Sequence, residues 1–150
     1  MSRILWIFIC VFMANIETNA FADNIEFRDA WLRGTPPGVT TAALYGDLVN
    51  STTDEEVLLS ISSDVAKHVM LHRTFREQQV TRMIHVEKLV LAPESRLRLS
   101  PGGLHLMLIG LRKSLVDGDR VLIQLHFQSG IEIDVVAKVG SIAQLSSPEG

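Results

Sequence analysis

The sequence predicts an all-β fold, an antiparallel β-sandwich. Short segments rich in Val, Ile, Leu and Thr recur between turn residues, apolar and polar residues alternate within them, and no segment has a long apolar stripe of helical period. Eight or nine short strands are typical of a sandwich. With 150 residues, 47% of them apolar and 21% charged, the chain has the length for one domain around one hydrophobic core.

The expected strands follow from this composition and from the turn residues that bound them. In chain order they are Ile25–Arg33, Thr41–Val49, Glu55–Ser63, Val69–Phe75, Val80–Val86, Arg96–Leu99, Leu104–Ile109, Arg120–Gln128 and Ile131–Val139. Turn residues separate most of them: Gly-Thr-Pro-Pro-Gly at 34–38, a polar stretch at 50–54, Ala-Pro-Glu at 92–94, Ser-Pro-Gly-Gly at 100–103 and Asp-Gly-Asp at 117–119.

Alternation is clearest near the C-terminus. One face of the segment Arg120–Gln128 carries four apolar side chains: Val121, Ile123, Leu125 and Phe127. The other face is polar. A two-residue Ser-Gly link at 129–130 then leads into the last expected strand, which again has apolar residues at every second position. This pattern indicates a β-hairpin.

The N-terminus has the features of an export signal. Arg3 provides a positive charge, Ile4–Ala14 is an apolar run of eleven residues, and Ala20-Phe21-Ala22 is an A-x-A cleavage pattern. The run is too short to span a bilayer as a stable helix, although an uncleaved anchor is the alternative interpretation. We expect cleavage after Ala22, which leaves residues 23–150 as the folded domain in the periplasm.

Cysteine chemistry is excluded from the mature protein on this interpretation. Cys10 lies inside the signal, and Phe8 and Ile9 before it are too bulky for a lipoprotein cleavage site, so we expect no membrane anchor after cleavage. The mature chain then has no disulfide, thiolate metal ligand or cysteine nucleophile. The net charge of −3, the pI near 5.9 and the absence of a Lys/Arg run argue against nucleic acid or an anionic membrane surface as partner.

Histidine and methionine are concentrated in one part of the chain. All three methionines after the signal, Met70, Met83 and Met107, fall within 38 residues, and His68, His72, His85 and His105 lie in nearly the same window. Imidazole and thioether together suit copper, especially soft Cu(I). Because strand residues two apart share a face, His105 and Met107 point the same way, and the same spacing recurs around Met70 and at Met83 and His85. Taken singly, each of these residues is more simply a core or surface residue.

A spaced motif extends this argument. The chain resembles the periplasmic copper chaperones of the PCuAC family, whose copper motif is a His, ten residues, a Met, twenty-one residues and then His-x-Met. The residues at these positions here are His72, Met83, His105 and Met107. The segments 29–38, 42–45 and 101–111 also resemble the family.

This resemblance implies a cupredoxin-like sandwich that binds one Cu(I) through those four side chains. It further implies delivery of the copper to apo copper-acceptor proteins of cytochrome oxidase assembly. Some relatives carry a His/Met-rich tail for a second copper. Residues 141–150 contain neither residue type, so no tail site is expected here.

The remaining candidates have simpler interpretations. His68, Met70 and His85 are either auxiliary ligands or residues at the rim of the site. His126, between two glutamines, is interpreted as a solvated histidine, and Trp31 as a core or strand-edge aromatic rather than a cation–π lid over copper. The Asp-Gly-Asp segment 117–119 is interpreted as a turn, since the further oxygen ligands of a calcium loop are missing.

Three functions remain open from the residues. The protein is a copper carrier, a copper sequestration or resistance protein with the same site and no dedicated recipient, or an exported sandwich used for adhesion or assembly. An electron-transfer cupredoxin is disfavoured because its site needs a cysteine thiolate. No arrangement of a nucleophile with an acid or base indicates an enzyme, so we expect a non-enzymatic protein and a monomer.

Overall fold

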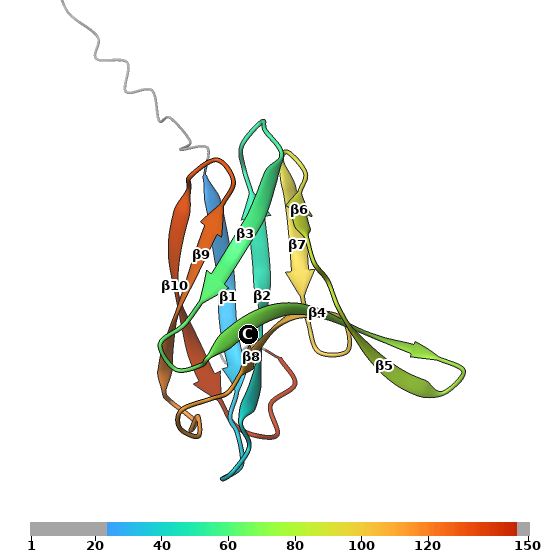
Figure 1. Ribbon diagram of the computed structural model, residues 1–150, viewed down its shortest axis with the longest axis vertical. Helices are drawn as coiled ribbons and strands as arrows, with labels where there is room; N and C mark the ends of the chain where they lie inside the picture. The colour runs from blue at the N-terminus through green and yellow to red at the C-terminus, as the bar shows by residue number, and fades with distance from the viewer. Residues whose placement is uncertain (1–23, 147–150) are drawn as a thin grey trace, which may run out of the picture.

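The structure, a computed structural model, describes residues 24–146 (Figure 1). These residues form ten strands and no helix, which confirms the all-β prediction. The strands are β1 (Ile25–Arg33), β2 (Thr41–Asn50), β3 (Glu56–Ser62), β4 (His68–Glu77), β5 (Val80–His85), β6 (Leu89–Leu91), β7 (Ser95–Leu99), β8 (Leu104–Ile109), β9 (Arg120–Phe127) and β10 (Glu132–Gly140). The expected signal peptide and its cleavage point lie outside the described residues.

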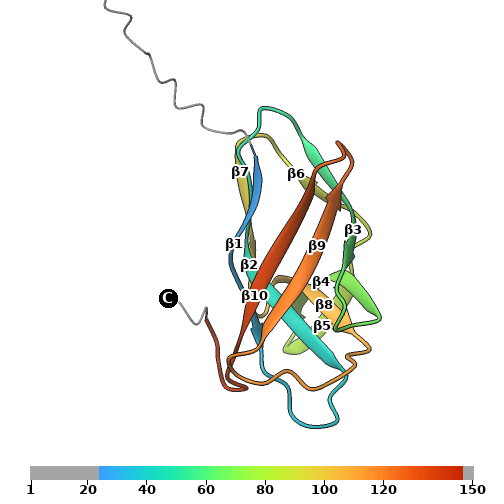
Figure 2. The same ribbon diagram turned by 90° about the vertical axis from the view of Figure 1, so that its left-hand side faces the viewer.

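One sheet bends into two layers. Its strand order is β5-β4-β8-β2-β1-β10-β9-β3-β6, with β7 paired to β2 beyond the end of β8. Figure 2 shows β9 and β10 crossing in front of β1 and β2. All pairs are antiparallel except β1 with β10, so the sheet is mixed. The sequence predicted antiparallel pairing throughout. Side-chain alternation does not depend on strand direction, so it could not reveal the parallel pair.

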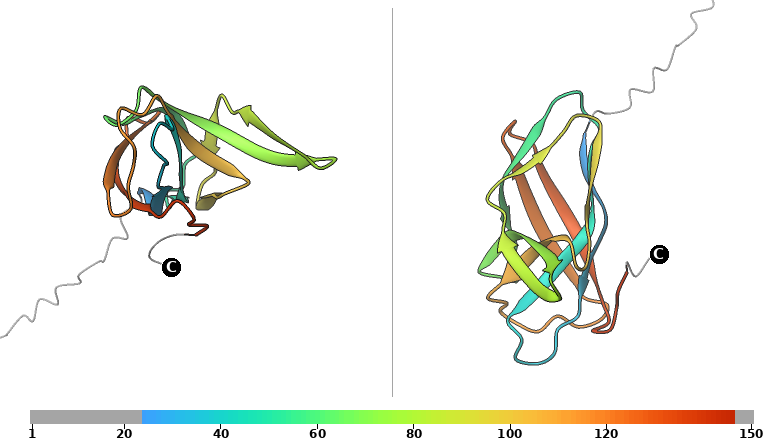
Figure 3. Two further views of the ribbon diagram at one scale, coloured as in Figure 1. Left: turned by 90° about the horizontal axis from the view of Figure 1, so that it is seen from below. Right: turned by 90° about the vertical axis from the view of Figure 1, so that its right-hand side faces the viewer.

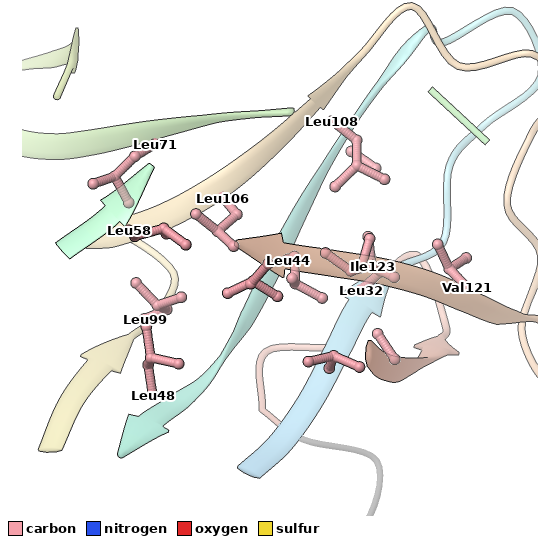
Figure 4. Packing of buried hydrophobic residues seen from close by; sticks show 14 of the residues in the cluster. Leu32, Leu44, Leu48, Leu58, Leu71, Leu99, Leu106, Leu108, Val121 and Ile123 are labelled. Carbon is pink, nitrogen blue, oxygen red and sulfur yellow. The ribbon is translucent and has the colours of Figure 1, made fainter. Parts of the chain in front are cut away.

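The core lies between the layers and is built from aliphatic side chains (Figure 4). The alternating residues of β9 are almost fully buried, as the sequence predicted, and face residues of β1, β2 and β8. Labelled examples from the other layer are Leu32, Leu44, Leu106 and Leu108. The single cysteine of the chain leaves no intrachain disulfide, so apolar burial is the main source of stability.

Two elements differ from the expected strands. β6 was not expected; this Leu-Val-Leu segment is too short to show alternation, and it becomes a strand by pairing with β3. β4 is longer than expected because it continues past the body of the sandwich to Glu77. The turn at Gln78 and Gln79 has positive φ at both residues and returns the chain antiparallel into β5.

The β4–β5 hairpin projects from the body of the sandwich (Figure 3). Its inner part pairs with β8, while β5 pairs only with β4 and forms one edge of the sheet. Every residue of β5 is exposed. The three strands β5, β4 and β8 carry most of the histidines and methionines singled out above.

Candidate metal centre

The four motif residues lie on one face of three neighbouring strands. His72 is in β4, Met83 in β5, and His105 and Met107 in β8. The opposite face is fixed by the core, because Leu71 of β4 and Leu106 of β8 are 5% and 1% exposed. Since successive residues of a strand point to opposite faces, burial of these leucines directs the neighbouring histidines and Met107 to the other face of the sheet.

Strand register brings these side chains together across the sheet. His72 is paired with His105 on one side and with His85 on the other, and Met83 lies opposite Thr74. The ring centroids of His72 and His105 are 6.1 Å apart. The His72 Nδ1 lies 3.2 Å from the Met83 Sδ. These contacts join residues that are up to 33 positions apart in sequence.

The separation of these two donors fits a shared ion. Zinc bonds to nitrogen and sulfur, about 2.0 and 2.3 Å long, serve as a guide to a first-row metal. At those lengths, donors 3.2 Å apart meet at one ion with an angle of roughly 95°. Cu(I) has no strict geometric requirement that such an angle would violate, because its d shell is full.

His105 is held in a fixed orientation. Its side chain is buried, and its Nδ1 donates a hydrogen bond to the carbonyl of Gly103 at 3.1 Å. A carbonyl only accepts, so the proton is assigned to Nδ1 and the lone pair to Nε2, the usual arrangement of a metal-binding histidine. The same carbonyl accepts the backbone N–H of Thr74 at 2.9 Å, which ties the β8 loop to β4.

Met107 lies two residues beyond His105 on the same face. It pairs with Met70 of β4 on one side and with Ala43 of β2 on the other, and it is half-buried. About 6.6 Å of strand separates its Cα from that of His105, a distance that the flexible methionine side chain spans easily. The register therefore places the fourth motif residue on the same face, one strand from His72 and two residues from His105, with Met83 on the far side of His72.

The local electrostatics favour the neutral form of His72. Burial lowers the pKa of this imidazole, and repulsion from His105 and His85 lowers it further. Only the neutral ring ligates a metal. Within residues 24–146, no group of three or more His, Cys, Asp or Glu side chains is arranged to hold a metal ion. The candidate set has two such residues, and its other two donors are thioethers.

Comparison with known proteins agrees with this architecture. A family model described as "Putative lipoprotein LpqE-like" matches residues 25–139, more than half of the chain. The chain belongs to this family. Among the curated relatives, the putative lipoprotein Lxx21020 of Leifsonia xyli subsp. xyli is 29% identical over 119 residues, which cover 79% of this chain and 70% of the relative.

Solved structures with the same cupredoxin-like fold include two copper-bound proteins. The copper-bound PCuAC domain from PmoF2 has 27% identity and a TM-score of 0.66, covering 78% of this chain and 92% of that domain. The Cu(I) form of DR1885 from Deinococcus radiodurans has 29% identity and a TM-score of 0.61, covering 74% of both chains. The PCuAC resemblance inferred from the sequence is thereby confirmed.

The auxiliary candidates of this LpqE-like chain occupy different places. His85 faces His72 edge-on, with ring centroids 5.6 Å apart. Met70, 38% exposed, pairs with Met107 and borders the centre. His68 pairs with Ile109 at the other end of β4, about 13 Å along the strand from His72. The fold therefore brings His85 and Met70 to the rim and leaves His68 outside it.

Three other predictions can be compared with the structure. His126 lies on the outer polar face, where its Nδ1 is 3.0 Å from a carboxylate oxygen of Glu132. Asp119 closes a turn by accepting the backbone N–H of Val116 at 3.2 Å. Trp31 is buried against Tyr45, with ring centroids 4.8 Å apart, and so belongs to the packed aromatic residues.

Two supporting groups were not identified from the sequence. Tyr45 lies between Trp31 and His105, with its ring centroid 6.2 Å from that of His105, and so packs beside the buried ligand. The Gly103 carbonyl orients the His105 ring. A glycine two residues before a candidate ligand is a weak sequence signal. The position of Tyr45 beside His105 depends on strand register, which the sequence does not show, so neither group could be identified from the sequence.

Proposed function

We propose that this protein is a periplasmic copper chaperone that binds one Cu(I) through His72, Met83, His105 and Met107. The observation that carries the proposal is the contact between the His72 Nδ1 and the Met83 Sδ, 3.2 Å apart on the face that also carries His105. The copper-bound PCuAC domain from PmoF2 and the Cu(I) form of DR1885 support it as structural relatives.

The donor set has the chemistry that Cu(I) prefers. Two imidazoles and two thioethers are neutral and comparatively soft, so the bound ion keeps a single positive charge. A centre that is open to solvent on the Met83 side tolerates that charge, because water and nearby dipoles solvate it. Thioethers do not protonate, so only the histidines link copper binding to pH.

The same donors permit transfer to another protein. A recipient with two cysteine thiolates binds Cu(I) more strongly than neutral ligands do, so copper should move toward such a recipient. We propose that the recipients are apo copper-acceptor proteins of cytochrome oxidase assembly. Met83, which is 51% exposed, is open to an incoming ligand. Transfer then proceeds by stepwise ligand exchange without release of free copper.

Loading is tested by titration of the purified mature protein with Cu(I) in competition with a chromophoric Cu(I) chelator. We expect one Cu(I) per chain and loss of that binding in the double variant Met83→Leu/Met107→Leu. Leucine keeps nearly the volume of methionine, so the fold should lose less than about 1.5 kcal/mol at each position. Unchanged binding in the double variant contradicts the proposed ligand set.

Transfer is tested by mixing the loaded protein with an apo acceptor that presents two cysteines, then separating the proteins and measuring copper in each. A carrier transfers most of its copper to the acceptor. Copper that stays on this chain at equilibrium favours sequestration. A deletion strain provides the second comparison: a chaperone mutant loses oxidase activity in copper-poor medium, whereas a sequestration mutant becomes sensitive to excess copper.

Export is the remaining part of the proposal. The lipoprotein description of the family is compatible with an exported protein. No helix within residues 24–146 has the length and hydrophobicity needed to cross a membrane. Intact-mass analysis of the periplasmic fraction should find a chain that begins at Asp23. A lipid-modified chain that begins at Cys10, or a cytoplasmic chain that retains Met1, contradicts this expectation.

A further inference from the structure

Charge is distributed unequally between the β4–β5 hairpin and the rest of the chain. The segment Lys67–Lys88 contains five Lys or Arg and two Glu, a formal charge of +3. Because the whole chain carries −3, the other 128 residues carry −6. No run of basic residues reveals this in the sequence, since consecutive cations are three or six positions apart. Strand pairing collects three of them, Arg73, Arg76 and Arg82, on one projecting element.

The cations of the hairpin are exposed and largely unpaired. Arg73, Arg76 and Arg82 are exposed, and within residues 24–146 the only ion pair among them joins Arg82 to Glu77 at 3.8 Å. Exposed pairs of this length contribute little. Elsewhere in the fold, Arg96 and Arg98 both bind the buried Asp47.

The same hairpin carries part of the proposed copper centre. Met83 follows Arg82 directly, and Arg73 follows His72, so each of these arginines is next to a proposed ligand in the chain. β5 is an edge strand, and Val80 and Ile84 are about half exposed, at 55% and 48%. Because successive strand residues point to opposite faces, Arg76 shares the face of His72 and Met83, whereas Arg73 and Arg82 lie on the other face with Val80 and Ile84. A molecule that approaches Met83 around the edge strand β5 therefore meets cations on both faces of the hairpin.

We propose that the β4–β5 hairpin is the docking surface for an acidic face of the protein that receives the copper. This inference rests on the proposed function, because the docked partner must reach the metal ligands. Opposite charges raise the rate of encounter and orient the partners, and the effect declines as salt screens them. The acidic remainder of the chain repels the same partner and so favours approach from the hairpin. Lipid headgroups offer no soft ligand for Cu(I), so the partner is a protein.

The test compares two double variants with equal net charge. Arg73→Gln/Arg76→Gln removes two cations from the hairpin, whereas Arg28→Gln/Arg120→Gln removes two exposed cations from β1 and β9. Arg28 makes only an exposed pair with Glu26, so its loss should leave the fold intact. Both variants are first titrated with Cu(I), and stoichiometric loading shows that the proposed copper centre is intact before docking is measured.

The probes are two synthetic acceptor peptides with the same Cys-x-x-Cys core, flanked either by four glutamates or by four lysines. Their Cu(I) affinities are matched beforehand by titration. At low salt we expect the acidic peptide to take copper from the parent protein roughly ten-fold faster than the basic peptide, with the advantage lost near ~0.5 M salt. The hairpin variant should lose most of this preference, and the β1/β9 variant should keep it.

Several outcomes overturn the proposal. Equal transfer rates to the two peptides exclude electrostatic docking. If both double variants lose the preference for the acidic peptide equally, the net charge of the protein and not the hairpin determines the transfer rate. Hairpin-dependent binding to vesicles that contain phosphatidylglycerol, with no preference between the peptides, assigns the surface to a membrane. A parent protein that takes up no Cu(I) contradicts the proposed function itself, and titration reveals this before any transfer is measured.

Discussion

The β8 side and the β5 side of the proposed copper centre differ sharply. β8 is paired on both sides, and its His105 is 5% exposed with its ring held by the Gly103 carbonyl. β5 is paired on one side only, and its Met83 is 51% exposed. One half of the centre is built into the sandwich, and the other half lies on an edge strand that projects into solvent.

Under the proposed function, we expect this difference to assign copper retention to the β8 side and copper release to the β5 side. Ligands that are ordered before the metal arrives lose little conformational entropy on binding, so the β8 side should supply most of the affinity. An exposed methionine must be ordered when copper binds and is the first ligand that a partner can displace. The β5 side should therefore affect release more than affinity.

The largest effect is expected from Met107→Leu, which removes a sulfur from the ordered side. Loss of an outer-shell partner of a metal ligand typically costs 10–100-fold in affinity, so loss of a ligand should cost about 100-fold or more. Competition titration with a chromophoric chelator measures it. Met70→Leu is the matched control on the paired strand and should change affinity by less than about three-fold. Equal losses in the two variants identify Met70 as a ligand of similar weight.

Met83→Leu should have a smaller effect on affinity, on the order of ten-fold, because part of the gain from this ligand is offset by ordering of its side chain. Thermal unfolding of the apo protein should be unchanged, since residue 83 is exposed. Stopped-flow transfer to a dithiol acceptor should be faster than for the parent protein. If Met83→Leu and Met107→Leu cost the same affinity, the two sides of the centre are equivalent and the comparison fails.

Acidification should weaken Cu(I) binding, and the logarithm of the Cu(I) affinity should change only gradually with pH. Because the pKa of His72 is lowered, chiefly by burial, protons compete for this ligand only below the ordinary histidine value of about 6.5. The contribution of His72 to the affinity should therefore stay nearly constant above that pH and decline below it, and at most two protons should compete per copper. The unfolded chain binds the His72 proton more readily, so the apo fold also loses stability on acidification. If competition titrations between pH 5 and 8 show more than two protons displaced per copper, a third histidine must be a ligand.

The smallest effect is expected from His85→Asn. His85 contacts the His72 ring edge-on from the exposed strand, so its loss should change Cu(I) affinity by less than about three-fold. The side chain is exposed, and the fold should be unaffected. A decrease as large as that of Met83→Leu adds His85 to the ligand set and makes the β5 side stronger than proposed.

Much of the strand pattern was predictable because alternation records which face is buried. β1 and β8 have the expected bounds, and the core side chains of β9 are those that the alternation indicated. The short β6 and the length of β4 were not predictable, since pairing with other strands defines both. For the candidate centre, the predicted residues do gather on one face, but their assignment as ligands stays a prediction.

The sequence by itself determined the all-β class, the faces of the main strands and the spaced His/Met motif, because these depend on residue type and a period of two. Only the tertiary structure decided which strand residues pair with each other and how deeply each candidate ligand is buried. It pairs His72 with His105, buries His105, leaves β5 at the edge and joins β1 to β10 in parallel. These features arise from contacts between segments distant in sequence, which local patterns do not specify. The positive charge of the β4–β5 hairpin is likewise a property of the tertiary structure, since strand pairing brings together arginines that are separated in the sequence.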